Sequence, residues 1–426
     1  KIIKILKYYN TQFMNTKKLT FAALLMIASS ANAQKYVGGD ISLLPEYEKV
    51  GSTYKYHDGT TAESALQLFK DEKLNTMRLR LFVNPSDYPN NDKNCCQTLD
   101  YVKTLGKRIK DSGFKLMLDF HYSDTWADPA KQWTPKAWEN LSDEELYTKI
   151  YDYTKDVLQQ MKEAGAEPEF IQTGNEISYG MLWGKEGSSN LKKCYVNDNA
   201  NWDRFTTLLK NAGKACREVC PQAKIIIHSE RVAQSDVLIQ FFKKINDAEV
   251  DYDIIGLSYY MYYHGKTSLL ETAVTQLESN YPDKKIMVVE FGYPYAWKVE
   301  GTKYEYLEEY PYTDDGQKKL TDDVIALLKK HENVNGLFWW WMEYNPYKDK
   351  LQGWYNAPLF DGRTGCATSA LSSLKDFLGG ESGIHGIEAD ASINSDNVWT
   401  TLSGIRTSKP SHAGLYIHNG KKVVVR

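Results

Sequence analysis

Two glutamates stand where a carboxylate could do chemistry. Glu176 closes the segment Thr173–Glu176, and Glu290 closes the run Val288–Glu290. Each follows an apolar stretch, where a charge is rarely placed by chance. A single such glutamate more often caps the following helix or pairs with a lysine. Two of them facing each other across a cleft supply what hydrolysis of a glycosidic bond requires, because one carboxyl must be protonated and the other ionised.

Polar neighbours of the two glutamates extend this candidate site. Asn175, directly before Glu176, is placed to hydrogen-bond the 2-hydroxyl of a sugar, a contact that strengthens in the transition state. Arg80 is expected to hold Glu290 ionised through a charge-assisted hydrogen bond, with Arg78 as the rival and a core ion pair as the alternative. Tyr260 is expected to donate to Glu290, with Tyr259 as its rival.

Further candidates for substrate binding follow the first and third apolar segments. His121 and Asp124 come directly after the third segment, and Trp126 follows them in a loop where it could stack on a sugar ring. Asp40, at the end of the first segment, belongs to the same predicted set. A lone histidine is more often structural, and no second histidine stands at the spacing of a metal site, so a metal hydrolase is disfavoured.

The elements that must position these residues alternate regularly between residue 34 and about residue 380. The predicted strands are Tyr36–Ser42, Thr76–Val83, Lys115–Phe120, Phe170–Asn175, Lys224–His228, Ile254–Tyr260, Lys285–Glu290 and Gly336–Trp341. The predicted helices are Ala62–Glu72, Thr98–Ser112, Asp143–Ala164, Asn201–Val219, Ser235–Asn246, Leu269–Ser279, Asp315–His331 and Thr368–Phe377. Such alternation indicates parallel βαβ units, and the apolar strand composition is typical of buried parallel strands.

Eight units can close into a barrel or form an open doubly wound sheet. The open sheet usually carries a glycine-rich phosphate-binding turn after its first strand, which Val37–Asp40 does not match. We therefore predict an α/β fold, a (β/α)₈ TIM barrel with a short C-terminal β appendage. Catalytic groups of such barrels project from the carboxyl ends of strands, which is where Glu176 and Glu290 fall, on strands four and seven.

The two ends of the chain read differently from the barrel. Residues 1–33 are expected to be an upstream extension and a signal peptide, because Lys17-Lys18 precede an apolar run, Leu19–Ala28, and a small-residue cleavage site, Ala31–Ala33. This predicts export, to the periplasm, the cell surface or the medium, without membrane insertion. Residues 34–380 form the predicted catalytic domain. Residues 384–426 form a predicted β tail, in which Asn419-Gly420 indicates a hairpin and a sorting role is one interpretation.

Amino-acid composition limits the kinds of molecule that this protein is expected to bind. Removing residues 1–33 takes away five lysines, which leaves 47 basic and 55 acidic residues and a net charge of −8. A mildly acidic chain is a poor partner for nucleic acid. The 30 Tyr and 11 Trp against 14 Phe suit surfaces that stack sugars. The six cysteines form no paired C-x-x-C motifs, which disfavours structural zinc. One or two disulfides are compatible with export, and the sequence does not assign which cysteines would pair.

Several longer motifs resemble one known family of enzymes. They are Arg78–Pro85, Leu118–Pro129, Gly174–Ile177, Ile255–Tyr260, Glu290–Pro294 and Pro358–Asp361. Together these segments resemble the family-53 glycoside hydrolases, the endo-β-1,4-galactanases, over residues 36 to about 377. By this resemblance Glu176 is the acid/base, Glu290 is the nucleophile, and Trp340 stacks on the sugar at the cleavage site.

The sequence also departs from the family pattern in two places. Trp341 stands where the family usually has a glutamate after the tryptophan of strand eight. Residues 296–312 lack the acidic segment through which some members bind calcium, so no calcium and no cofactor are predicted.

The resulting hypothesis is a monomeric, exported, retaining endo-β-1,4-galactanase that acts on the galactan side chains of pectin. Two alternatives stay open at this point. One is another retaining endo-glycosidase, a mannanase or a cellulase, and the other is a non-catalytic barrel that only binds glycans.

Overall fold

The chain divides into two compact units, Lys1–Leu378 and Gly379–Arg426. The computed structural model describes residues 34–87, 92–346, 348, 350, 357–379, 399–401, 406–407, 414–418 and 421–425. The expected export segment, residues 1–33, lies outside the described residues, so its role stays a prediction.

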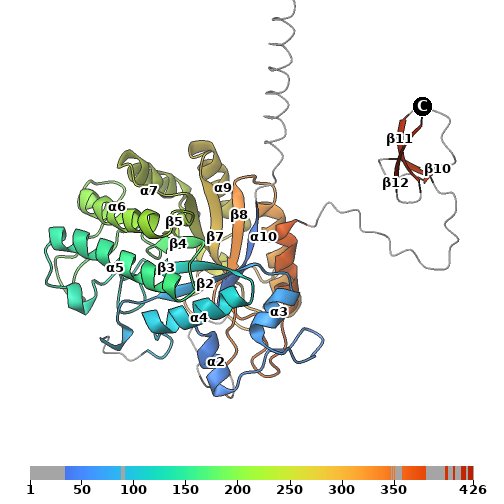
Figure 1. Ribbon diagram of the computed structural model, residues 1–426, viewed down its shortest axis with the longest axis horizontal. Helices are drawn as coiled ribbons and strands as arrows, with labels where there is room; N and C mark the ends of the chain where they lie inside the picture. The colour runs from blue at the N-terminus through green and yellow to red at the C-terminus, as the bar shows by residue number, and fades with distance from the viewer. Residues whose placement is uncertain are drawn as a thin grey trace, which may run out of the picture. The chain divides into compact units, whose positions relative to one another are not determined.

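The first unit is built around eight parallel strands that close into a barrel in sequence order (Figure 1). The strands are β1 (Tyr36–Asp40), β2 (Thr76–Leu81), β3 (Lys115–Phe120), β4 (Phe170–Thr173), β5 (Lys224–Ser229), β6 (Ile254–Tyr259), β7 (Lys285–Phe291) and β8 (Val334–Trp339). Closure comes from β1, which pairs with both β2 and β8. Gly38 is required there, because a Cβ would lie 1.7 Å from the Thr76 carbonyl oxygen on β2. The predicted TIM barrel is therefore confirmed.

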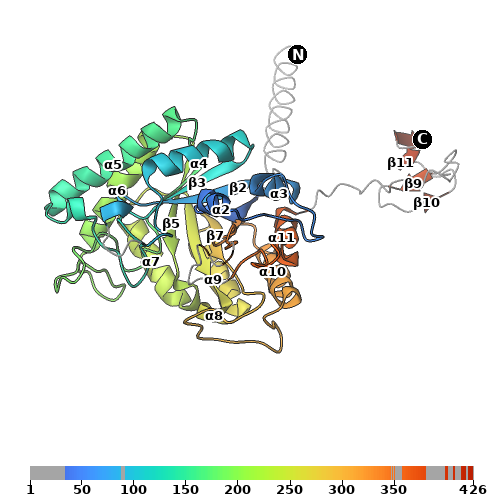
Figure 2. The same ribbon diagram turned by 90° about the horizontal axis from the view of Figure 1, so that it is seen from below.

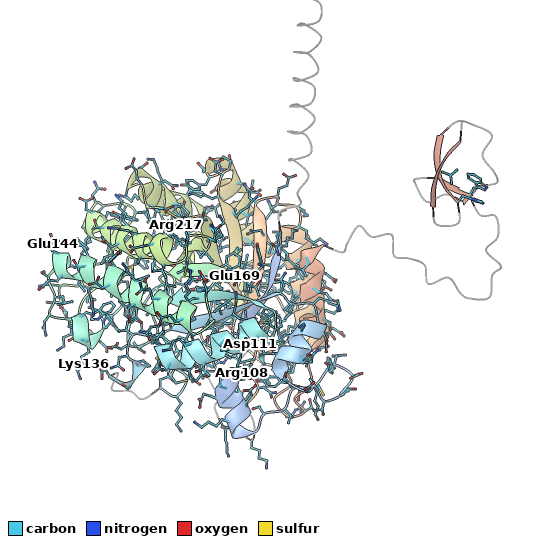
Figure 3. The ribbon with its side chains drawn as sticks, viewed as in Figure 1. Arg108, Asp111, Lys136, Glu144, Glu169 and Arg217 are labelled. Carbon is cyan, nitrogen blue, oxygen red and sulfur yellow. The ribbon has the colours of Figure 1, made fainter. Side chains whose placement is uncertain are left out.

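Helices surround the barrel and cover the outer faces of its strands (Figure 2). They are α2 (Leu44–Val50), α3 (Ala65–Asp71), α4 (Leu99–Asp111), α5 (Asp143–Glu163), α6 (Trp202–Val219), α7 (Ser235–Asp247), α8 (Met261–His264), α9 (Thr267–Asn280), α10 (Asp314–Leu328) and α11 (Ser369–Ser373). Side-chain caps fix several starts, as in α5, where Ser142 and Glu145 form a capping box. Charged side chains lie on the outside, among them Arg108 and Arg217 (Figure 3), which pair with Glu48 and Asp251.

Most predicted helices and strands agree with the observed ones, and the differences arise where tertiary structure decides the boundaries. Helices α2 and α8 were not predicted; both are short and lie within βα connections. The predicted fourth strand extends to Asn175, whereas β4 ends at Thr173 because Gly174 has a φ of 111°. The predicted eighth strand, Gly336–Trp341, starts and ends two residues after the observed β8, Val334–Trp339. Trp341, with a φ of 52°, already lies beyond the strand.

The barrel interior has an apolar layer below a polar one. The apolar layer consists of Met117, Phe170, Ile226, Ile254, Met287, Val289 and Phe338. Side chains alternate between the two faces of a strand, so the residues two positions further along β3, β4 and β5 also point inward. These are Asp119, Gln172 and His228, and all three are fully buried. The polar layer therefore lies at the carboxyl ends of the strands, where the catalytic groups were expected.

The second unit is a small antiparallel sheet with the strand order β10-β9-β11-β12. Its strands are β9 (Trp399–Thr401), β10 (Arg406–Thr407), β11 (Gly414–His418) and β12 (Lys421–Val425). β11 and β12 pair from Gly414↔Val425 to His418↔Lys421. The predicted hairpin is confirmed, while its Asn-Gly turn lies outside the described residues.

The cysteines carry no cross-links. All six are free thiols, so the disulfides that the sequence left open do not form. Burial raises the pKa of the Cys96 thiol to about 11 and that of Cys194 to about 12. Among the described residues, no helix is both long enough and apolar enough to span a bilayer. The same residues contain no group of three or more His, Cys, Asp or Glu placed to hold a metal ion, and the expectation of no calcium stays a prediction.

Candidate active site

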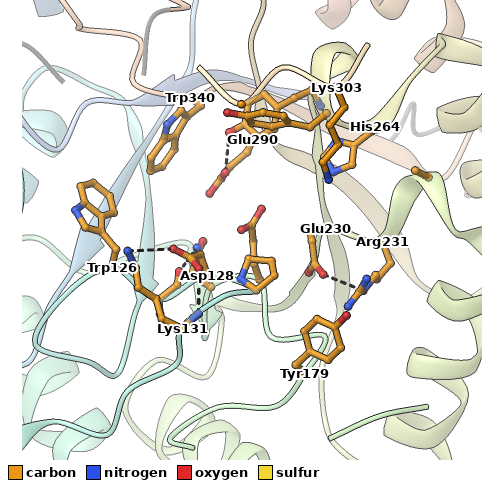
Figure 4. Close-up of a pocket in the computed structure, with 18 of the residues that line it drawn as sticks. Trp126, Asp128, Lys131, Tyr179, Glu230, Arg231, His264, Glu290, Lys303 and Trp340 are labelled. Atoms are coloured by element: carbon orange, nitrogen blue, oxygen red, sulfur yellow. Dashed lines mark hydrogen bonds and ion pairs between the residues drawn. The ribbon is translucent and has the colours of Figure 1, made fainter. Parts of the chain in front are cut away.

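A cleft of about 810 Å³ opens at the carboxyl ends of the strands (Figure 4). Its volume lies in the range of sites that bind small molecules. Six of the predicted site residues line it, namely Trp126, Asn175, Glu176, Tyr260, Glu290 and Trp340. The structure thus brings residues from five different βα units to one place.

Glu176 follows β4 in an unusual backbone conformation. Its φ is 47°, in the left-handed region that non-glycine residues seldom adopt, and Gly174 before it has a φ of 111°. The neighbouring strand holds this turn in place, because the Glu176 amide donates to His228 Nδ1 at 3.3 Å and the Ile177 amide donates to the His228 carbonyl at 3.1 Å. Such local strain is typical of functional positions.

The carboxyl group of Glu176 ends a directed chain of hydrogen bonds. Gln172 Nε2, fixed as a donor by Asp119 Oδ1 at 2.7 Å, donates to His228 Nδ1 at 2.9 Å. The histidine proton is therefore assigned to Nε2, which donates to Ser258 Oγ at 2.8 Å. Ser258 in turn donates to Glu176 Oε1 at 2.6 Å. Burial lowers the pKa of His228 well below its usual value, so the ring is neutral.

Glu290 lies near the end of β7 and receives two other donors. The Tyr260 hydroxyl donates to Glu290 Oε2 at 2.7 Å, as predicted, while Tyr259 bonds to the Gly265 carbonyl instead. The ion pair predicted for Arg80 is made by Arg78, whose Nη2 lies 3.0 Å from Glu290 Oε1.

Arg78 is the centre of the buried charge network. Its guanidinium also contacts Asp119 at 2.8 Å and Asp40 at 3.2 Å, and it donates to Asn175 Oδ1 at 2.9 Å. Arg78 is fully buried. This buried cation balances one of the three negative charges around it, and its contact fixes the position of Glu290.

Arg80 lies closer to the cleft than Arg78 and packs against the tryptophans that line it. It pairs with Asp40 at 2.6 Å, and its guanidinium carbon lies 4.6 Å from the ring centre of Trp126 and 5.2 Å from that of Trp340. Arg78 and Arg80 are two residues apart and both point inward. They differ in depth, and only the deeper one reaches Glu290.

The remaining predicted binding residues lie beneath the cleft. His121 Nδ1 accepts from the Ala127 amide at 3.0 Å, and Asp124 accepts from the amides of Asn84 and Lys136 at 2.9 and 2.8 Å. Neither these two residues nor Asp40 and Arg80 are among those that line the cleft. Their direct binding of substrate stays a prediction, while the observed contacts order the surrounding loops.

The two glutamates are close enough to act on one bond. Ser258 Oγ lies 2.6 Å from Glu176 Oε1 and 3.5 Å from Glu290 Oε2, so these two oxygens are at most about 6.1 Å apart. Burial raises the pKa of Glu176, and the negative charge of Glu290 raises it further. Burial also raises the pKa of Glu290, to about 7, and Arg78 and Tyr260 keep it from rising further. The proton therefore belongs on Glu176 and the charge on Glu290.

Sequence analysis missed the residues that join the strands into one site. His228 and Ser258 are at or next to the carboxyl ends of β5 and β6, and Glu230 and Arg231 directly follow β5. The rule that found Glu176 and Glu290, a polar residue at the end of an apolar strand, would also have found His228 and Glu230. Their contacts with other βα units join residues at least 30 positions apart in sequence, so no local pattern could have assigned those partners.

Comparison with known proteins gives the family of this chain and matches its fold. The family model described as glycosyl hydrolase family 53 matches residues 36–375. An arabinogalactan endo-β-1,4-galactanase of Cellvibrio japonicus is 32% identical over 387 residues, which covers 85% of this chain and 96% of the relative. The family-53 catalytic domain of Ignisphaera aggregans superposes with a TM-score of 0.69 at 31% identity, covering 82% of this chain and 97% of that one. A fungal β-1,4-galactanase gives a TM-score of 0.67 at 27% identity, covering 80% of this chain and 99% of that one.

Proposed function

The chain belongs to glycosyl hydrolase family 53, and from that premise we propose that its cleft hydrolyses internal β-1,4-galactosidic bonds of galactan. The substrate is the galactan, or type I arabinogalactan, side chain of pectin. Relatives named as arabinogalactan endo-β-1,4-galactanases support this assignment. The tryptophans that line the cleft beside the two glutamates offer flat apolar surfaces to a neutral sugar chain.

The observation that carries the mechanism is the separation of the two carboxyl groups. Inverting enzymes hold their carboxyls about 6.5–9.5 Å apart to leave room for a water molecule, whereas retaining enzymes hold them about 5–5.5 Å apart. The limit of about 6.1 Å between Glu176 Oε1 and Glu290 Oε2 lies below the inverting range and supports the retaining arrangement. Hydrolysis therefore proceeds with retention, in two steps.

In the first step Glu290 attacks the anomeric carbon, and Glu176 gives its proton to the oxygen of the departing sugar. The bond between the anomeric carbon and that oxygen breaks, and a galactosyl ester of Glu290 forms. In the second step Glu176 takes a proton from water, the water oxygen attacks the anomeric carbon, and Glu290 leaves as a carboxylate. Arg78 and Tyr260 stabilise that carboxylate, and Trp340 packs against the sugar that is attacked.

Azide rescue tests the two roles separately. In Glu290→Ala a small anion can enter the vacated space and attack directly, so azide should restore turnover and give an α-galactosyl azide. In Glu176→Ala an activated substrate with an acidic leaving group should still form the ester, and azide should release a β-galactosyl azide. The opposite stereochemistry in the two variants would reverse the assignment. Full activity in either variant would place the active site elsewhere.

A screen on polysaccharides tests the substrate. Purified linear galactan should be cut to short oligosaccharides, while mannan and cellulose should stay intact. Cleavage of mannan or cellulose at a higher rate than galactan would favour the alternative glycosidase. Binding of galactan without any cleavage would favour a glycan-binding barrel.

Export and monomeric behaviour belong to the same proposal. The basic, apolar and small-residue segments within residues 14–33 support a cleaved signal peptide. Amino-terminal sequencing of the secreted protein should begin at Gln34, and size-exclusion chromatography with light scattering should give the mass of one chain.

A further inference from the structure

The cleft has two chemically different halves. In Figure 4, Trp126 and Trp340 lie on one side of Glu290, and Tyr179, Glu230 and Arg231 lie on the other. The backbone amide of Trp340 donates to the carbonyl of Phe291, which places this tryptophan next to the nucleophile. The sugar that Glu290 attacks therefore lies over the tryptophans. The departing sugar must lie beyond Glu176, against the other half.

That other half is a rigid composite of two loops. Ser178, from the β4 loop, donates to Glu230 Oε1 at 2.5 Å, and Arg231 Nε lies 2.9 Å from the same oxygen. Arg231 also donates to Gln234 Oε1 at 3.0 Å. The guanidinium carbon of Arg231 lies 4.1 Å from the ring centre of Tyr179, in a cation–π stack.

Glu230 has a polar atom to offer to a ligand. Its side chain lines the cleft and is 11% exposed. Oε1 has two partners, but Oε2 is buried with no hydrogen-bond partner among the described residues. A buried carboxylate oxygen without a donor costs free energy, which the hydroxyl of a bound sugar would recover after a small rotation of the side chain. None of the catalytic roles described above uses Glu230.

We propose that Tyr179, Glu230 and Arg231 form the binding site for the leaving galactosyl unit, an inference that rests on the proposed function. Glu230 accepts a hydrogen bond from a hydroxyl of that unit, and the Tyr179–Arg231 stack packs against its ring. The same site binds an acceptor sugar when the galactosyl ester is transferred to a sugar instead of to water. In that transfer the acceptor hydroxyl oxygen attacks the anomeric carbon and gives its proton to Glu176, while the ester bond breaks and Glu290 leaves as a carboxylate.

Two substrates separate this site from the rest of the cleft. Galactotetraose carries a sugar as its leaving group, whereas β-galactobiosyl fluoride leaves only fluoride. Glu230→Gln keeps the shape of the side chain and removes its charge. We expect kcat/KM for galactotetraose to fall about 10- to 100-fold, the effect of one hydrogen bond to a charged group, and kcat/KM for the fluoride to stay within about twofold of wild type.

Asp92→Asn is the matched control on the tryptophan side. Asp92 lines the cleft and accepts a hydrogen bond from Trp126 Nε1 at 2.8 Å. This variant should lower kcat/KM for both substrates by similar factors, because both carry sugars on that side. Equal losses for both substrates in Glu230→Gln would overturn the proposal. If wild-type enzyme cleaved neither galactotetraose nor galactan, the proposed function itself would fail.

Glu230 also helps to raise the pKa of Glu176, so an indirect effect must be separated from binding. A loss that acts through Glu176 should disappear at acidic pH, where Glu176 is protonated in both proteins, whereas a binding loss should persist at every pH. Transfer gives an independent readout. With galactobiosyl fluoride as donor and galactobiose as acceptor, Glu230→Gln should form several-fold less galactotetraose relative to hydrolysis. An unchanged ratio would overturn the proposal.

Discussion

The hydrogen-bond chain from His228 through Ser258 to Glu176 makes the pH dependence testable. Ser258→Ala removes the donor to Glu176 Oε1 and changes no charge. That donor stabilises the ionised carboxylate more than the neutral acid, so its loss raises the pKa of Glu176 further. Glu176 must be protonated in the first step, and activity is lost as pH rises through its pKa. The basic limb of the profile should therefore move to higher pH.

The size of the shift follows from hydrogen-bond energies. A hydrogen bond to a charged group contributes about 1.5–3 kcal/mol and a neutral one about 0.5–1.5 kcal/mol. The difference, about 1–1.5 kcal/mol, corresponds to a shift of the limb by about one pH unit. The variant also leaves His228 Nε2 without its acceptor in a fully buried position, which should lower the free energy of unfolding by about 1–3 kcal/mol.

The assay is kcat/KM for galactotetraose against pH, which reports on the groups of the free enzyme. Ser42→Ala is the control, because Ser42 is an equally buried serine whose Oγ accepts from the Arg80 amide and contacts neither glutamate. It should reduce stability and leave the basic limb in place. A basic limb that does not move in Ser258→Ala, or that moves to lower pH, would refute the direction assigned to the chain.

Four further outcomes are expected. Tyr260→Phe removes a donor to Glu290, so the pKa of Glu290 should rise and kcat should fall about 10- to 100-fold. Because Glu290 must be ionised, the acidic limb of the pH profile should move to higher pH, and an unmoved acidic limb would contradict this. Arg78→Met should lower the free energy of unfolding by about 3–5 kcal/mol in urea denaturation, because three carboxylates lose a buried partner. Trp340→Ala should lower kcat/KM for galactotetraose about 10- to 100-fold through lost stacking area, with an unchanged circular dichroism spectrum. A chain ending at residue 380 should keep most of its activity on soluble galactan, and a large loss of turnover with an intact fold would assign the tail a role in the cleft.

Much of the architecture could be predicted because a parallel barrel repeats one local pattern. Each buried strand is a short apolar run, and the residue at its carboxyl end faces the cleft whatever the rest of the chain does. Glu176 and Glu290 could therefore be found one strand at a time. The Tyr260 contact followed from the same logic, since β6 and β7 are neighbours.

The parts that could not be predicted depend on depth and on backbone conformation. Arg78 and Arg80 have the same orientation on β2, and sequence does not reveal which of them lies at the level of Glu290. The early end of β4 depends on the left-handed backbone at Gly174 and Glu176, which is stabilised by His228 on another strand. Local propensity carries no information on such a tertiary contact.

The free thiols bear on the conditions under which this protein can fold. Exported proteins that depend on disulfides need an oxidising compartment and often an isomerase to reach their native state. Here the six cysteines are unpaired, and those at positions 95, 194, 216 and 220 are buried with raised pKa values, which keeps them as unreactive thiols. Strand closure, packing and the buried charge network around Arg78 hold the barrel without any disulfide among these cysteines. The catalytic unit should therefore fold equally well in a reducing cytosol and tolerate reductants during preparation. The compartment in which the protein is made and the compartment in which it acts can then differ in redox potential.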